Sequence, residues 1–76
     1  MNEKFSYNIF MCIGEIIKGL RIEHGMTQTD LASLLFTSQD TISLWERNKS
    51  LPDVKSVIAM ASIFEVTTDY ILGVEK

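Results

Sequence analysis

The sequence predicts an all-α fold, a compact bundle of five short helices, from three observations. Along most of the chain, apolar residues recur three and four positions apart, which is the spacing of one face of a helix. Helix-capping residues stand between these stretches, and no stretch shows the sustained alternation of apolar and polar residues that a half-buried strand needs. With 76 residues, 46% of them hydrophobic, the chain can form one small domain around a single core.

The first helix is predicted by an apolar stripe that ends before Gly25. Gly25 suits the left-handed residue that follows a helix, and His24 lies in the last turn, where a cation is favoured. The start is open, because Ser6 could cap an early start or the helix could begin near Ile13, and residues 5–10 are the only plausible strand. The stripe consists of Ile9, Ile13, Ile16, Ile17 and Leu20.

Two short helices are predicted next, separated by a break at residues 36–37. Thr27 is a suitable N-cap for the first, with Asp30 three residues later, and Ser38 is a suitable N-cap for the second. Asn48 can adopt a left-handed conformation and end the second helix. The apolar faces consist of Leu31, Ala32, Leu34 and Leu35 in the first helix, and of Ile42 and Trp45 in the second.

The last two helices complete the bundle. Pro52 is placed where the first turn of a helix accepts proline, and Thr67 or Thr68 caps a final short helix that ends at Gly73. The fourth apolar stripe consists of Val54, Val57, Ile58, Ala61 and Phe64. We expect residues 13–73 to form the domain, residues 1–12 an N-terminal arm or helix extension, and residues 74–76 a tail.

Composition excludes several classes of protein. One cysteine, Cys12, and one histidine cannot form a disulfide or a metal-ligand set. There is no acid–base pair, activated nucleophile or phosphate loop, so we expect no enzymatic activity, no cofactor and no small-molecule ligand. No apolar run has membrane-spanning length and no export signal is evident, so we expect a cytoplasmic protein.

The charge of the chain argues against strong non-specific binding to nucleic acid. The formal net charge is −3, and residues 13–50 contain four basic and five acidic residues. A basic surface is the usual electrostatic sign of a nucleic-acid-binding protein. The lack of a basic surface does not argue against a small local surface that contacts nucleic acid.

The second and third helices are joined too closely to pack antiparallel, so they must cross at a steep angle. Ala32 lies where they would cross most closely, and its small side chain permits the crossing. The helix N-termini at Thr27 and Ser38 offer backbone N–H groups that suit phosphate. The third helix would present outward a mainly polar set suited to reading base edges: Ser38, Gln39, Asp40, Thr41, Ser43 and Leu44.

Residues 13–73 resemble the helix-turn-helix domain of the XRE/Cro-type phage and bacterial repressors. The matching segments, in order and spacing, are IGEIIKGLRIEHGMTQTDLA, SQDTISLWERNKSLPD and VIAMASIFEVTTDYILG. The resemblance implies a lambda-repressor-like domain of five helices that binds double-stranded DNA as a homodimer on a palindromic operator and represses transcription. The third helix would be the recognition helix.

The resemblance also implies roles for particular residues. Gln28 matches a position that contacts phosphate and supports the recognition helix, and Arg47, Lys49 and Ser50 match a loop that contacts phosphate. The outward residues of the third helix match the positions at or near base edges.

Four residues depart from the family pattern. Phe36 stands where a left-handed glycine is usual, which implies an altered or strained turn, and Asn48 replaces another common glycine. Leu44 stands where a long polar or basic residue is frequent, but it could pack against a thymine methyl group. Asp40 could accept from a cytosine amino group, or could serve only as a favourable charge at a helix N-terminus.

Two further questions stay open at the level of sequence. For the dimer we expect the C-terminal helix as the interface, with the N-terminal arm as the second choice. The acidity, Phe36, Asp40 and Leu44 also allow a protein-binding module on the same fold, such as an antitoxin, an antirepressor or an adaptor.

Overall fold

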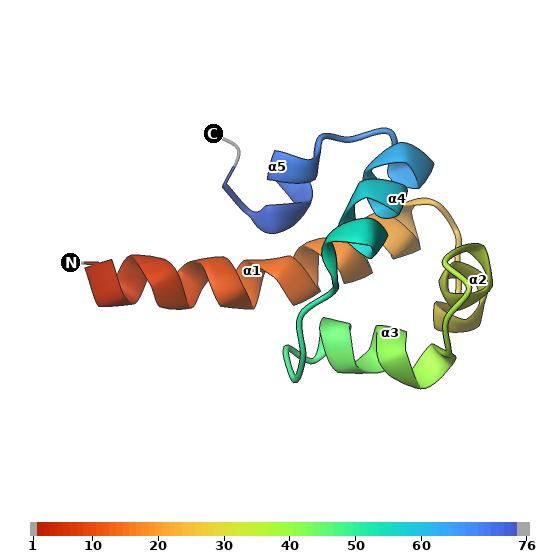
Figure 1. The fold of residues 1–76 in the computed structure, drawn as a ribbon, viewed down its shortest axis with the longest axis horizontal. Helices are drawn as coiled ribbons and strands as arrows, with labels where there is room; N and C mark the ends of the chain where they lie inside the picture. The colour runs from red at the N-terminus through yellow and green to blue at the C-terminus, as the bar shows by residue number, and fades with distance from the viewer. Residues whose placement is uncertain (1, 75–76) are drawn as a thin grey trace.

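The computed structural model describes the backbone of residues 2–74 and the side chains of residues 13–74. These residues form five helices and no strand, which confirms the predicted fold class. The helices are α1 (Asn2–Glu23), α2 (Gln28–Leu34), α3 (Gln39–Glu46), α4 (Val54–Phe64) and α5 (Thr68–Leu72). The C-terminal half of α1 crosses the body, with α3 on one side of it and α4 and α5 on the other, and its N-terminal half projects outward (Figure 1).

The first helix begins earlier than either predicted start. α1 begins at Asn2, so the helix starts neither after Ser6 nor near Ile13, and the alternative of a strand at residues 5–10 is wrong. A short apolar run cannot by itself distinguish a strand from a helix. Here the run continues an existing helix, which needs no new nucleation. The division between an arm and a domain at residues 12 and 13 falls within α1 and stays a prediction.

The predicted apolar stripes supply most of the core, although three of their described residues are exposed and the side chain of Ile9 lies outside the described residues. Leu34, Val54 and Ile58 are 49%, 75% and 58% exposed, although their spacing placed them on core-facing stripes. Conversely, Met60 is completely buried without having been predicted. The buried apolar side chains are Ile13, Ile17, Leu20, Leu31, Ala32, Ile42, Trp45, Val57, Met60, Phe64 and Ile71.

The helix caps agree with the sequence except at α4. Thr27 Oγ1 accepts from the Asp30 N–H at 3.0 Å, and Asp30 Oδ2 accepts from the Thr27 N–H at 2.9 Å, which makes a reciprocal capping box. Ser38 and Thr67 cap α3 and α5. The cap of α4 is Asp53, so Pro52 lies before the helix and not in its first turn as predicted.

Candidate nucleic-acid interface

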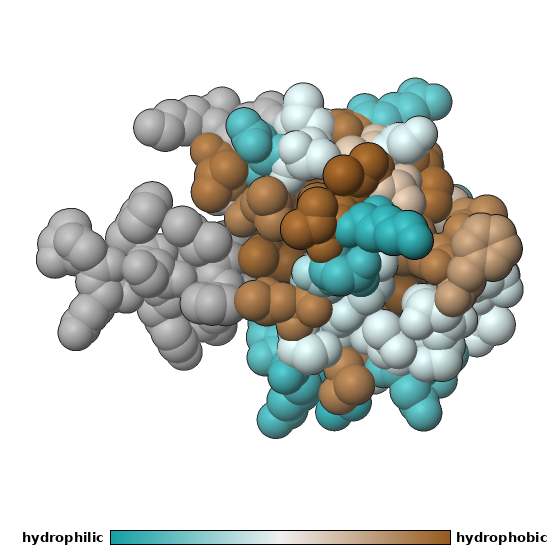
Figure 2. Space-filling view, in the orientation of Figure 1, coloured by the Kyte–Doolittle hydropathy of each residue, from teal (hydrophilic) through white to brown (hydrophobic). Residues whose placement is uncertain are grey.

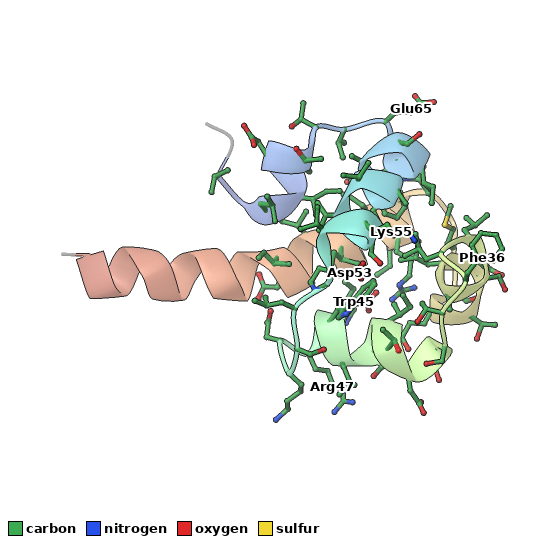
Figure 3. The ribbon with its side chains drawn as sticks, in the orientation of Figure 1. Phe36, Trp45, Arg47, Asp53, Lys55 and Glu65 are labelled. Atoms are coloured by element: carbon green, nitrogen blue, oxygen red, sulfur yellow. The ribbon has the colours of Figure 1, made fainter. Side chains whose placement is uncertain are left out.

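The turn between α2 and α3 keeps its geometry in spite of Phe36. Phe36 adopts φ 56°, and the following Thr37 N–H donates to the Ala32 carbonyl at 3.0 Å. Ala32 is 3% exposed and permits the close crossing of the two helices. Phe36 is 96% exposed and points away from the body (Figure 3), so its side chain gains no burial that offsets a left-handed conformation costing about 1–2 kcal/mol.

The other end of α3 is held against α1 by a contact that the sequence did not indicate. Asn48 adopts φ 59°, as expected, and its Oδ1 accepts from the Gly14 N–H at 3.2 Å. A Cβ atom on Gly14 would lie 2.5 Å from both Asn48 Oδ1 and the Trp45 carbonyl oxygen. Gly14 is therefore the residue that allows α1 and α3 to approach. The available signal was a glycine inside a helical pattern.

Glu46, which was not among the predicted site residues, links α3 to α1. Arg21 Nε donates to Glu46 Oε2 at 2.7 Å and Arg21 Nη2 donates to Glu46 Oε1 at 3.0 Å, while Nη1 donates to the Met26 carbonyl at 2.8 Å. The side chains of Arg21 and Glu46 are 11% and 3% exposed. The hydrogen bonds that Arg21 donates to Glu46 raise the pKa of Arg21 in spite of the opposing effect of burial. The two charges form a buried, bidentate pair.

A chain of hydrogen bonds runs from this pair to the first residue of α3. Glu46 Oε1 also accepts from Gln28 Nε2 at 3.0 Å, and Gln28 Oε1 accepts from Gln39 Nε2. Because the carboxylate can only accept, it sets the orientation of the Gln28 amide, which in turn sets that of Gln39. The carbonyl oxygen and the second N–H of Gln39 have no partner among the described residues, so they are available to a ligand.

The remaining predicted residues lie along α3 and the loop after it. Ser38 Oγ and Thr41 Oγ1 share a hydrogen bond of 2.9 Å within the cap, while Asp40 is exposed. Arg47 Nε donates to Ser43 Oγ at 3.1 Å. Gln39, Ser43 and Arg47 are four residues apart and therefore share one face of the helix. Exposed positions are also found for Thr27, Leu44, Lys49 and Ser50.

The exposed charges of α3 and of the loop after it are basic on balance. Burial in the pair with Arg21 removes Glu46 from the exposed charges of α3, leaving Arg47 and Lys49 near its C-terminal end and Asp40 near its start. Glu15 and Glu23 instead line a hollow with Tyr70 of α5, across α1 from α3 (Figure 1). The α3 surface is therefore less acidic than the net charge of −3 implies.

No described helix has the length and apolar character needed to cross a membrane.

Comparison with known proteins agrees with this geometry. A family model described as helix-turn-helix matches residues 17–71. The HTH-type transcriptional activator BcrR of Enterococcus faecalis is 35% identical over 66 residues, which are 87% of this chain and 32% of that protein. The HTH-type transcriptional regulator ImmR of Bacillus subtilis (strain 168) is 30% identical over 66 residues, which are 87% of this chain and 52% of that protein. The chain thus spans about a third to a half of the length of these relatives.

Two solved structures share the arrangement of helices. The P22 c2 repressor, solved in complex with a synthetic operator, superposes with a TM-score of 0.77 at 27% identity, covering 83% of this chain and 96% of that one. A transcriptional regulator from Listeria innocua superposes with a TM-score of 0.79 at 25% identity, covering 84% of this chain and 60% of that one.

Proposed function

Because the chain belongs to the helix-turn-helix family of transcriptional regulators, we propose that it binds double-stranded DNA with α3 in the major groove. Two copies bind a palindromic operator, and the bound dimer represses transcription by blocking access to the promoter. The hydrogen-bonded chain from Arg21 through Glu46 and Gln28 to Gln39 is the observation that carries this proposal.

The orientation of Gln39 favours adenine. One N–H of its amide is used by Gln28, which leaves the carbonyl oxygen and the other N–H for a base. A glutamine amide in that arrangement accepts from adenine N6 and donates to adenine N7. A buried ion pair that holds one exposed amide in a single orientation is well suited to reading one base. Asp40, Thr41, Ser43 and Leu44 extend the same surface.

The loop after α3 supplies contacts to the DNA backbone. Arg47 and Lys49 are exposed and Arg47 extends away from the body (Figure 3). Together with Ser50, and with Thr27 and Gln28 at the start of α2, they contact phosphates and set the register. With so few cations, the salt dependence of binding is shallower than for a basic repressor.

The test is selection from a random duplex pool at moderate salt, followed by affinity measurements on the enriched sequence. We expect an enriched palindrome with adenine at one position of each half-site. The Gln39→Ala variant should lose about 1–3 kcal/mol of binding free energy and its preference at that adenine alone. Ser62→Ala, an exposed serine on α4, is the matched control and should bind as the unaltered protein does.

If no sequence is enriched while the protein remains folded, the proposal is wrong. If a sequence is enriched but the Gln39→Ala variant keeps the same base preference as the unaltered protein, the recognition surface lies elsewhere. A reporter gene behind the selected operator then distinguishes repression from activation.

A further inference from the structure

Asp40 and Leu44 are neighbours on the outward face of α3. The inward face is marked by the buried side chains of Ile42 and Trp45. Asp40 and Leu44 are both exposed, and their spacing of four residues places them on one face of the helix. Figure 2 shows mostly hydrophilic side chains along the edge of the molecule where α3 lies, and hydrophobic ones gathered over α4 and α5. We call these two residues the Asp40–Leu44 pair.

The carboxylate of Asp40 has no partner in the described part of the chain. The carboxylates of Asp30 and Asp53 are both used in helix caps. The cap of α3 is made by Ser38 instead, and Arg47, two turns further along, is hydrogen-bonded to another side chain. Because an ionised carboxylate can only accept hydrogen bonds, both oxygens of Asp40 are available to a donor on a ligand.

The major groove offers few such donors. The donors on the base edges there are N4 of cytosine and N6 of adenine. Adenine N6 lies between two acceptors, its own N7 and O4 of the paired thymine, whereas cytosine N4 lies between O6 of the paired guanine and its own C5–H. A carboxylate therefore meets less repulsion beside cytosine than beside adenine. Guanine and thymine offer it only acceptors, so Asp40 disfavours both.

The spacing of the Asp40–Leu44 pair matches neighbouring base pairs. Four residues of helix rise by about 6 Å, and successive base pairs are about 3.4 Å apart. Leu44 therefore reaches a base one or two steps from the base that faces Asp40. Leucine has no donor or acceptor, and the apolar group on the major-groove edges is the C5-methyl group of thymine. Gln39 directly precedes Asp40, so its adenine lies in the same short segment.

We propose that the Asp40–Leu44 pair reads a cytosine and a thymine in each half-site. Asp40 accepts from cytosine N4, and Leu44 packs against the methyl group of a thymine one or two base steps away. The proposal rests on the proposed binding of α3 in the major groove, and it adds the bases beside the adenine of Gln39. It also gives Asp40 a role in specificity, because a carboxylate that meets no donor opposes binding and so excludes other sequences.

Replacing Asp40 by asparagine tests the cytosine. The unaltered protein should bind the selected operator about tenfold or more tightly than the same duplex with that C·G pair changed to T·A in one half-site. In Asp40→Asn this ratio should fall below about threefold, because an amide both donates and accepts and so tolerates every base. Asp69→Asn is the matched control, since it removes the same charge from the second residue of α5, and it should keep the ratio.

The ratio of the two affinities separates base reading from a general effect of charge. If Asp40 only favours the start of α3 or repels phosphates, Asp40→Asn changes the affinity for both duplexes by the same factor and leaves the ratio intact. That result would overturn the role of Asp40.

Replacing the thymine by deoxyuridine tests Leu44 without altering the protein, since the two bases differ only by the methyl group. The unaltered protein should lose about fourfold in affinity when one half-site is changed, which is what burying one group of that size contributes. Leu44→Ala should bind both duplexes equally. Leu34→Ala, the same change at an exposed leucine of α2, should keep the difference. Equal binding of the two duplexes by the unaltered protein would overturn the role of Leu44.

The two proposals can fail separately. If the unaltered protein selects no DNA sequence, the proposed function is wrong, and reading by the Asp40–Leu44 pair is wrong with it. If selection enriches an operator with adenine in each half-site but without cytosine and thymine beside it, the proposed function stands and the role of the pair is overturned.

Discussion

Replacing Glu46 by glutamine tests whether the buried pair orders the recognition surface. The substitution preserves the shape of the side chain but exchanges one acceptor oxygen for an NH₂ group. Both Glu46 oxygens accept hydrogen bonds, from Arg21 and from Gln28, so in either orientation the new NH₂ group must face another donor. The buried Arg21 guanidinium also loses its counter-charge.

The expected loss of stability is large for a domain of this size. Removing one partner of a buried ion pair costs about 3–5 kcal/mol, and because glutamine still supplies one acceptor we expect about 2–4 kcal/mol. A chain of 76 residues has a total stability of roughly 4–11 kcal/mol. The loss can be measured by urea unfolding followed by the fluorescence of Trp45, which is 4% exposed.

The control for this experiment is Glu23→Gln, which makes the same change in charge at an exposed position of α1. It should change stability by less than about 0.5 kcal/mol. If Glu46→Gln changed stability no more than this control, the view of Glu46 as the organising residue would be refuted. In the folded Glu46→Gln variant we also expect a weaker preference for adenine, because the Gln28 amide is free to turn over.

Three further substitutions test the backbone and the caps. Phe36→Gly should stabilise the domain by about 1 kcal/mol in urea unfolding, because glycine removes the strain of a left-handed conformation and the lost side chain is 96% exposed. Lower stability of this variant would mean that the phenyl group packs against the domain in solution. Gly14→Ala should destabilise by about 1–3 kcal/mol, because its Cβ would lie 2.5 Å from atoms of α3 and its loop. Its control is Gly19→Ala, where a Cβ meets nothing within 4 Å and helix propensity should add about 0.5–1 kcal/mol; equal effects of the two substitutions would contradict the close approach. Hydrogen bonds from Thr27 lower the pKa of Asp30 in the folded state. The stabilisation by the Asp30 carboxylate is therefore complete above the ordinary Asp pKa of 3.8, and it is lost as the pH falls through the lower pKa of the folded state. The acid limb of the stability curve should therefore be flatter for Asp30→Asn, and an unchanged limb would show that the capping box does not persist.

The sequence by itself determined the features that depend on residues within one turn of each other. The capping box joins Thr27 to Asp30, and the cap of α3 joins Ser38 to Thr41, in both cases across three residues. The left-handed conformation of Asn48 was likewise anticipated from its residue type, whereas that of Phe36 was implied only by the family resemblance. Such contacts are local, so residue types and spacing suffice to predict them.

Which apolar residues are buried was decided only by the tertiary structure. Val54 and Ile58 belong to the same predicted apolar stripe as buried Val57 and Phe64, yet they remain exposed because no other helix in the described part of the chain covers that side of α4. A helical period identifies an apolar stripe but does not say how wide a face the neighbouring helices cover.

The connection between the core and the recognition surface was also decided by the tertiary structure. Arg21 and Glu46 are 25 positions apart, and Gly14 and Asn48 are 34 positions apart. Nothing within its own helix or turn indicates the distant partner of any of these residues. Their roles arise only because folding brings α1 against α3, where burial turns one carboxylate into a fixed acceptor for Gln28 and so orients Gln39.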